Sequence, residues 1–161
     1  MSLIKYIPLL PILILNIACA NGNLPYSNDS FSEDKYKNNN TVLLFQKFPE
    51  SNEYKGVLKG GSLFSVKYWA GVHYGVHAVM LLGPQMKTIP DELNSQIIQL
   101  AKLALYEPEL SVLVDSIHKR NIKLSDSPEI IHINSDEYSE FYISSSIVRE
   151  AILIEIKLYR G

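Results

Sequence analysis

The chain has 161 residues, a formal net charge of −2 and a single cysteine. That length suits one domain and is too short for two ordinary ones. The small net charge and the absence of a run of Lys or Arg argue against proteins that bind nucleic acid or an anionic membrane face.

Residues 1–20, MSLIKYIPLLPILILNIACA, have the pattern of an export signal. Lys5 supplies a positive start, an apolar run follows, and Ala18 and Ala20 place small residues before a cleavage point after Ala20. The run is too short to cross a hydrocarbon core of about 30 Å. We therefore expect a signal peptide and a periplasmic protein.

Cys19 leaves a second maturation route open. A cysteine that follows a small residue at the end of such a run is also the site at which a lipoprotein signal is processed, although Asn16 stands where an aliphatic residue is usual. The alternative location is therefore the envelope, with a lipid anchor on Cys19 and the domain facing the periplasm. Cleavage after Ala20 would leave no cysteine, so the core would have to hold without disulfides.

Residues 21–40 are rich in Asn, Ser and charged residues, a composition that predicts a flexible tether. Residues 41–161 are expected to form a single globular domain. At its start, residues 41–48 (TVLLFQKF) fit either a strand or the first turns of a helix, and residues 49–62 fit a loop.

The middle of the chain predicts three helices. Ser62 is a suitable N-cap for a helix that ends at Leu82, before Gly83-Pro84. A second helix begins near TIPDEL, and a third, shorter one follows Pro108. Their apolar stripes consist of Leu93, Ile97, Leu100, Ala101 and Ala104, and of Leu110, Leu113, Val114 and Ile117. Short connections between three helices favour antiparallel neighbours.

The last forty residues favour strands. Residues 129–134 (EIIHIN) resemble one strand, and residues 151–159 alternate Ile and Leu with mixed residues at a period of two. A helix over 145–159 is the alternative, and the isoleucine content favours the strand. The expected fold is thus mainly α, a small antiparallel helical bundle, with an α+β variant in which a C-terminal strand pair is added.

Two spacings in YWAGVHYGVHAV suggest different roles. His73 and His77 are one helical turn apart, but Tyr74 stands where a zinc protease needs its glutamate, and no third ligand is evident. We predict no metal and no cofactor. Small residues at Gly71, Gly75 and Ala78 would line one face of a helix, so we expect them to allow close packing of a neighbouring helix. No set of catalytic residues remains, and we predict that the chain is not an enzyme.

The block from residue 60 to residue 120 resembles a known family. A helix carrying YWAGVHYGV, a loop LLGPQMKTIPDEL, a helix QIIQLAKLALYEPEL and a further helix SVLVDSIHKR follow one another after an export leader. This order is similar to the Tai/Rap immunity proteins, periplasmic helical proteins that neutralise peptidoglycan amidases delivered by type VI secretion. The resemblance implies a protein partner, a secreted amidase whose cleft is occluded. Gln85 and Lys87, in the loop 83–91, are the guessed contact residues.

Two functions therefore remain open at this stage. One is an exported immunity or inhibitor protein that binds a cell-wall amidase, and the other is an envelope lipoprotein that acts as a structural or interaction module without catalysis. A metal-dependent hydrolase using His73 and His77 is a third and weaker hypothesis. The sequence does not predict an oligomeric state.

Overall fold

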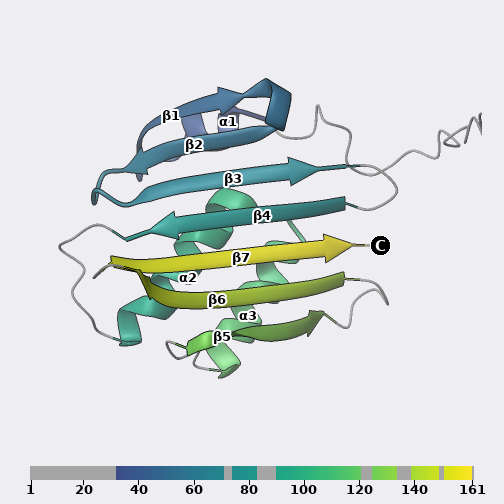
Figure 1. The fold of residues 1–161 in the computed structure, drawn as a ribbon. Helices are drawn as coiled ribbons and strands as arrows, with labels where there is room; N and C mark the ends of the chain where they lie inside the picture. Colours follow the sequence, from purple (N-terminus) through teal and green to yellow (C-terminus); the bar gives the residue numbers. More distant parts are fainter. Residues whose placement is uncertain are drawn as a thin grey trace, which may run out of the picture.

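Alternation of buried and exposed side chains, the pattern seen at residues 151–159, extends through much of the chain. The computed structural model describes residues 32–70, 74–82, 90–120, 125–133, 139–148 and 151–160. Within them the strands form one antiparallel sheet of seven in the order β1-β2-β3-β4-β7-β6-β5 (Figure 1). These strands are β1 (Val42–Phe48), β2 (Glu53–Leu58), β3 (Leu63–Trp69), β4 (Tyr74–Leu81), β5 (Ser125–Ile133), β6 (Ser139–Val148) and β7 (Ala151–Arg160).

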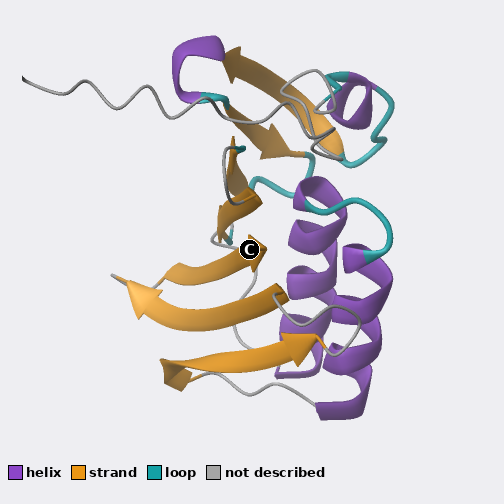
Figure 2. Cartoon of the chain, turned by 90° about the vertical axis from the view of Figure 1, so that its right-hand side faces the viewer, coloured by secondary structure: helices purple, strands orange, loops and turns teal. Residues whose placement is uncertain are grey.

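Helices make up the second layer. Two of them, α2 (Pro90–Ala104) and α3 (Glu109–Arg120), lie on the same side of the sheet (Figure 2). The first of these packs against β3, β4 and β7, and the second packs against α2 and β5. Two short elements, α1 (Asp34–Lys37) and the 3-10 turn η2 (Pro49–Ser51), flank β1. The fold is therefore a two-layer α+β structure, and the predicted mainly α helical bundle is wrong.

The largest correction concerns residues 62–82, which were expected to form one helix. The described residues of this segment form β3 and β4, two antiparallel strands in which Lys67 lies opposite His77 and Trp69 lies opposite Gly75. Phe64, Val66 and Tyr68 of β3 are buried, and so are Val76, Ala78 and Met80 of β4, which is the two-residue period of a strand. Helix packing by Gly75 and Ala78 is thus excluded. Gly71, the third member of that predicted stripe, lies outside the described residues.

Residues 49–62 were also misassigned, because a loop was expected where β2 lies. This strand joins β1 to β3, with Gly56 opposite both Phe45 and Phe64. A β-bulge between Val42 and Leu44 shifts the register of the β1–β2 pair. The remaining predictions of secondary structure agree better: residues 42–48 are a strand, 129–133 belong to β5 and 151–160 form β7.

The second and third predicted helices are confirmed as α2 and α3. Every member of the first predicted stripe, from Leu93 to Ala104, is buried, as are Leu113 and Ile117 of the second, whereas Leu110 and Val114 are half-buried. These side chains meet the buried faces of β3, β4, β6 and β7 in a single core. Each Å² of apolar area removed from water stabilises the folded chain by about 25 cal/mol. We therefore expect the packing of the helices on the sheet to be the main source of stability.

Tyr36, which lies within the expected tether, belongs to this core. Tyr36 of α1 is buried and stacks on Tyr54, with ring centroids 4.6 Å apart. Its hydroxyl lies 3.2 Å from that of Tyr68, which donates a hydrogen bond of 3.0 Å to the carbonyl oxygen of Ala104 at the end of α2. Part of the expected tether is therefore folded onto the domain. Residues 21–31 lie outside the described part of the chain, as do the expected signal peptide and Cys19.

Lys35 of α1 provides a second link to the C-terminal end of α2. Its ammonium group donates to the carbonyl oxygen of Leu105 and lies 3.9 Å from the ring centre of Tyr106. Burial lowers the pKa of Lys35 to about 7, although the nearby carboxylate of Glu107 acts in the opposite direction. A lysine with this pKa is neutral in the folded chain above pH 7, while the unfolded chain still holds the proton.

This difference in proton binding predicts a pH dependence. Because the unfolded chain binds more protons than the folded chain between the two pKa values, the free energy of unfolding should rise between about pH 7 and pH 10.5. We expect Lys35→Met to remove that rise, as measured by urea denaturation at several pH values. If the free energy of unfolding changed with pH equally in the parent and the variant, Lys35 would have to stay charged in the folded chain. The Leu105 carbonyl oxygen and the Tyr106 ring would then be stabilising its ammonium group.

Candidate functional site

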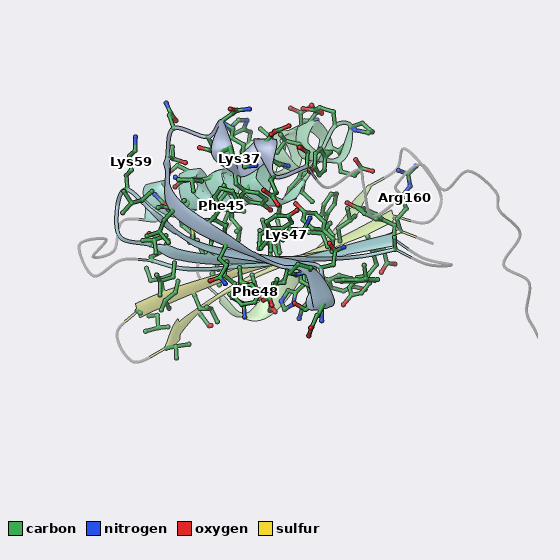
Figure 3. All side chains as sticks on the ribbon, turned by 90° about the horizontal axis from the view of Figure 1, so that it is seen from above. Lys37, Phe45, Lys47, Phe48, Lys59 and Arg160 are labelled. Carbon is green, nitrogen blue, oxygen red and sulfur yellow. The ribbon has the colours of Figure 1, made fainter. Side chains whose placement is uncertain are left out.

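The face of the sheet opposite α2 and α3 is the candidate site, because neither of these two long helices covers it (Figure 2). Figure 3 shows the two faces at β1: Phe45 and Lys47 lie on the helix side, and Phe48 lies on the other side. We call this second surface the open face. On the central strands it carries the residues that alternate with the core: Leu63, Ser65, Lys67 and Trp69; Gly75, His77, Val79 and Leu81; and Leu153, Glu155, Lys157 and Tyr159.

A polar network lies at the centre of the open face. The register of β4, β7 and β6 brings together His77, Glu155, Lys157 and Ser144, although β4 is far from the β6–β7 pair in sequence. His77 Nε2 lies 2.6 Å from Glu155 Oε1, and Lys157 Nζ lies 3.0 Å from the same oxygen. Ser144 Oγ donates to Glu155 Oε2 at 3.2 Å. One carboxylate is thus bound by three donors.

The electrostatics of this network follow from those contacts. Burial raises the pKa of Glu155, but hydrogen bonds and charge from Lys157 and His77 lower it by more, so the pKa lies below its ordinary value. A carboxylate held in this ionised state is a poor proton acceptor. The serine hydroxyl bonds to the carboxylate and not to the imidazole, so these groups do not form the Ser–His–acid relay of a hydrolase.

Aromatic side chains form one border of the network. The ring of Trp69 lies 5.7 Å from that of Tyr159, and Tyr159 meets Tyr142 edge-on at the same centroid distance. Trp69 covers Gly75, where a side chain would collide with the indole. Gly75 therefore has a function different from the predicted one: its lack of a side chain lets the indole lie flat across β4. Tyr142 also donates to Glu140 Oε2 at 2.6 Å, and this bond raises the pKa of its phenol.

A hollow of about 580 Å³ lies beside these rings. It is lined by Tyr142 and residues 144–146 of β6, and by Glu155, Lys157 and Tyr159 of β7. The volume is within the range of roughly 300–1,000 Å³ that is usual for ligand sites. A second, smaller polar group lies on β2 and β3, where Glu53 accepts from Ser65 at 2.6 Å and pairs with Lys55 at 3.2 Å.

One end of the sheet is aliphatic. Leu44, Leu63, Ile147 and Val148 lie where β1 and β3 begin and β6 ends, and between 46% and 64% of each residue is exposed. We call these four residues the aliphatic end. They lie on three strands of the sheet, and β1 and β6 are separated by β2, β3, β4 and β7.

Most of the predicted site residues cannot be placed. Gln85, Lys87, His73 and Cys19 lie outside the described residues. Of the predicted histidine pair, His77 is described, and it contacts Glu155. Among the described residues there is no group of three or more His, Cys, Asp or Glu side chains that could hold a metal ion.

The sequence analysis did not predict four of these site residues, Glu155, Lys157, Tyr159 and Tyr142. A signal for three of them was present, because the alternation of residues 151–159 places Glu155, Lys157 and Tyr159 on one face of a strand. Their partners could not be inferred while residues 62–82 were taken as a helix.

The fold and the open face define a two-layer α+β protein with a helix-covered sheet and a mixed polar and aromatic surface. No match to this chain is found among protein-family models, curated proteins or solved structures. None of the described helices has the length and apolar character needed to cross a membrane.

Proposed function

We propose that this chain is a non-catalytic protein-binding module and that its partner docks on the open face. The observation that carries the proposal is the set of Trp69, Tyr159 and Tyr142 beside a polar network, on the side of the sheet opposite α2 and α3. Tryptophan and tyrosine are enriched at protein interfaces, where their rings exclude water and their polar atoms bind across the contact.

Charged and aliphatic groups extend this surface. Lys67 is exposed beside Trp69, and the aliphatic end lies at the far side of the same sheet. A surface of this kind supplies apolar burial together with charges that orient the partner during encounter. The contacts of Glu155 do not form a recognisable catalytic set, which supports binding in preference to catalysis.

The partner is proposed to be another exported protein, in keeping with the leader expected at residues 1–20. A cell-wall amidase is the partner that the resemblance to the Tai/Rap immunity proteins implies. That implication now depends on residues 83–120, because the first helix of the resemblance corresponds to β3 and β4. A soluble form and a form anchored through Cys19 would both present the open face.

Crosslinking in cells tests this proposal. A photoreactive benzoylphenylalanine would replace Lys67 on the open face or Asp115 on the exposed side of α3, in the full chain at its native level. We expect irradiation to yield one discrete protein adduct from position 67 and none from position 115. An adduct from position 115 alone would contradict the proposal, because α3 lies on the opposite side of the molecule.

The identified partner then allows affinities to be compared. We expect Trp69→Ala to weaken binding by about 2 kcal/mol, or roughly 30-fold, as is usual for a central aromatic residue. Asp115→Lys should leave the affinity unchanged. Thermal melts of each variant show whether any loss of binding comes from unfolding.

A further inference from the structure

The hollow beside β6 and β7 has a lining that differs from that of most small-molecule pockets. Such pockets are mainly hydrophobic, with a few polar groups. Here, side chains facing the hollow carry the hydroxyls of Ser144 and Ser146, the phenols of Tyr142 and Tyr159, and a carboxylate and an ammonium group from β7. A purely apolar ligand would remove water from these polar groups without offering them hydrogen bonds, which is costly.

Among the described residues that line the hollow, one is anionic and one is cationic, so their charges cancel. Glu155 and Lys157 pair at 3.0 Å, and Glu155 is also bound by His77 and Ser144. The carboxylate is therefore poorly available to a cationic ligand, and the ammonium already has an anionic partner. A charged ligand would compete with this pairing for one of the two groups. The balance favours an uncharged ligand that exchanges hydrogen bonds with hydroxyl, carboxylate and amine groups.

The aromatic border supplies the second requirement. Tyr159 is 44% exposed and lies between Trp69 and Tyr142, so part of its ring remains open beside the hollow. The carbon–hydrogen faces of a pyranose ring pack well on such rings, while its hydroxyls act as both donors and acceptors. A compound with both properties matches the two parts of this site.

We propose that the hollow binds a neutral saccharide, with a sugar ring on Tyr159 and its hydroxyls directed at Ser144, Ser146 and the Glu155–Lys157 pair. This inference goes beyond the proposed protein partner and does not depend on it. The saccharide could be a free oligosaccharide or part of a polymeric glycan, since the same ring and hydroxyls would be recognised in both.

Fluorescence offers a direct test, because Trp69 is the only tryptophan of the chain and lies next to Tyr159. The full chain would be titrated with cellotriose, maltotriose and N-acetylchitotriose, and with the anionic trigalacturonate and the cationic chitosan trimer. We expect saturable binding of at least one neutral trisaccharide and none of the charged ones. Co-sedimentation with insoluble cellulose, chitin and peptidoglycan would show whether a polymer is bound as well.

Three variants and a control connect binding to the hollow. We expect Tyr159→Ala to raise the dissociation constant about tenfold, and Tyr159→Phe to change it little because the ring remains. Ser146→Met should weaken binding by placing a larger side chain in the hollow without removing a ring or adding a second tryptophan. Asp115→Ala, on α3, is the control and should bind like the parent chain.

Two results would overturn the inference. One is the absence of any fluorescence change or amide chemical-shift change at the solubility limit of every neutral trisaccharide. The other is saturable binding that both Ser146→Met and Tyr159→Ala leave unchanged, since the sugar would then lie elsewhere. Circular dichroism of the variants separates loss of the fold from loss of the ligand.

Discussion

Replacing Tyr36 by alanine should lower the free energy of unfolding by about 3–5 kcal/mol, the range found for large buried aromatic residues. Tyr36 is 1% exposed, and its ring stacks on Tyr54 and lies 5.8 Å from that of Phe64 and 5.4 Å from that of Phe45. Its removal would open a cavity between α1 and the sheet. Small domains have a total stability of about 5–15 kcal/mol, so the loss is a large fraction of the whole.

The matched control is Tyr36→Phe, which keeps the ring. It removes only the hydroxyl that faces Tyr68, so we expect a loss of about 1 kcal/mol. Urea denaturation of the full chain measures both variants. If neither Tyr36→Ala nor Tyr36→Phe lowered the free energy of unfolding, residues 32–40 would not be part of the cooperative core. The domain would then begin nearer to residue 41.

Gly56→Ala should destabilise the chain by about 3 kcal/mol, the upper part of the range for overpacking. A Cβ atom at position 56 would lie 2.5 Å from the carbonyl oxygen of Leu44 and 2.6 Å from the ring of Phe64. The carbonyl belongs to the backbone of β1, and the ring is buried in the core, so neither can move aside cheaply. The pairing of β1 with β2 would have to give way.

Gly75→Ala is the matched control for this prediction. Its added methyl group would meet the ring of Trp69, a side chain on the open face that can swing outward. We expect a loss of less than about 1 kcal/mol, because moving one partly exposed side chain costs less than moving a backbone. Tryptophan emission should shift as the indole leaves its place. A Gly75→Ala variant less stable than Gly56→Ala would contradict the geometry of both sites.

These residues also show why the fold was only partly predictable. In α2, apolar residues on one side and polar residues on the other give a clear helical period, and the buried stripe from Leu93 to Ala104 agrees with it. In β3 both faces carry large apolar residues, because Leu63 and Trp69 lie on the open face and Phe64 and Tyr68 in the core. Apolar residues on both faces obscure the period of two that identifies a strand.

The same ambiguity affected the other misassigned segments. Gly71, Gly75 and Ala78 have helical spacing, but Gly75 is needed because Trp69 crosses β4 at that point. In β2, Gly56 lies in the middle of a strand of six residues, and this segment was predicted to be a loop. Both glycines permit close approach within a sheet, a role that single-sequence spacing does not distinguish from helix packing.

The candidate site required information that local sequence does not contain. The alternation within β7 placed Glu155, Lys157 and Tyr159 on one face. Their partners His77 and Ser144 reach them only through the order β4-β7-β6, in which His77 and Glu155 are 78 residues apart in sequence. Long-range strand order depends on how the whole sheet packs, so the polar network could not be derived from any one segment.

Carbene footprinting of the chain, free and bound to its crosslinked partner, tests the central claim most directly. We predict that Lys67, Trp69 and Tyr159 are labelled in the free chain and lose their labelling in the complex, while Lys102 and Asp115 on the helical layer keep theirs. Protection of Lys102 and Asp115 with unchanged labelling of Lys67 and Trp69 would contradict the claim that the open face is the binding surface.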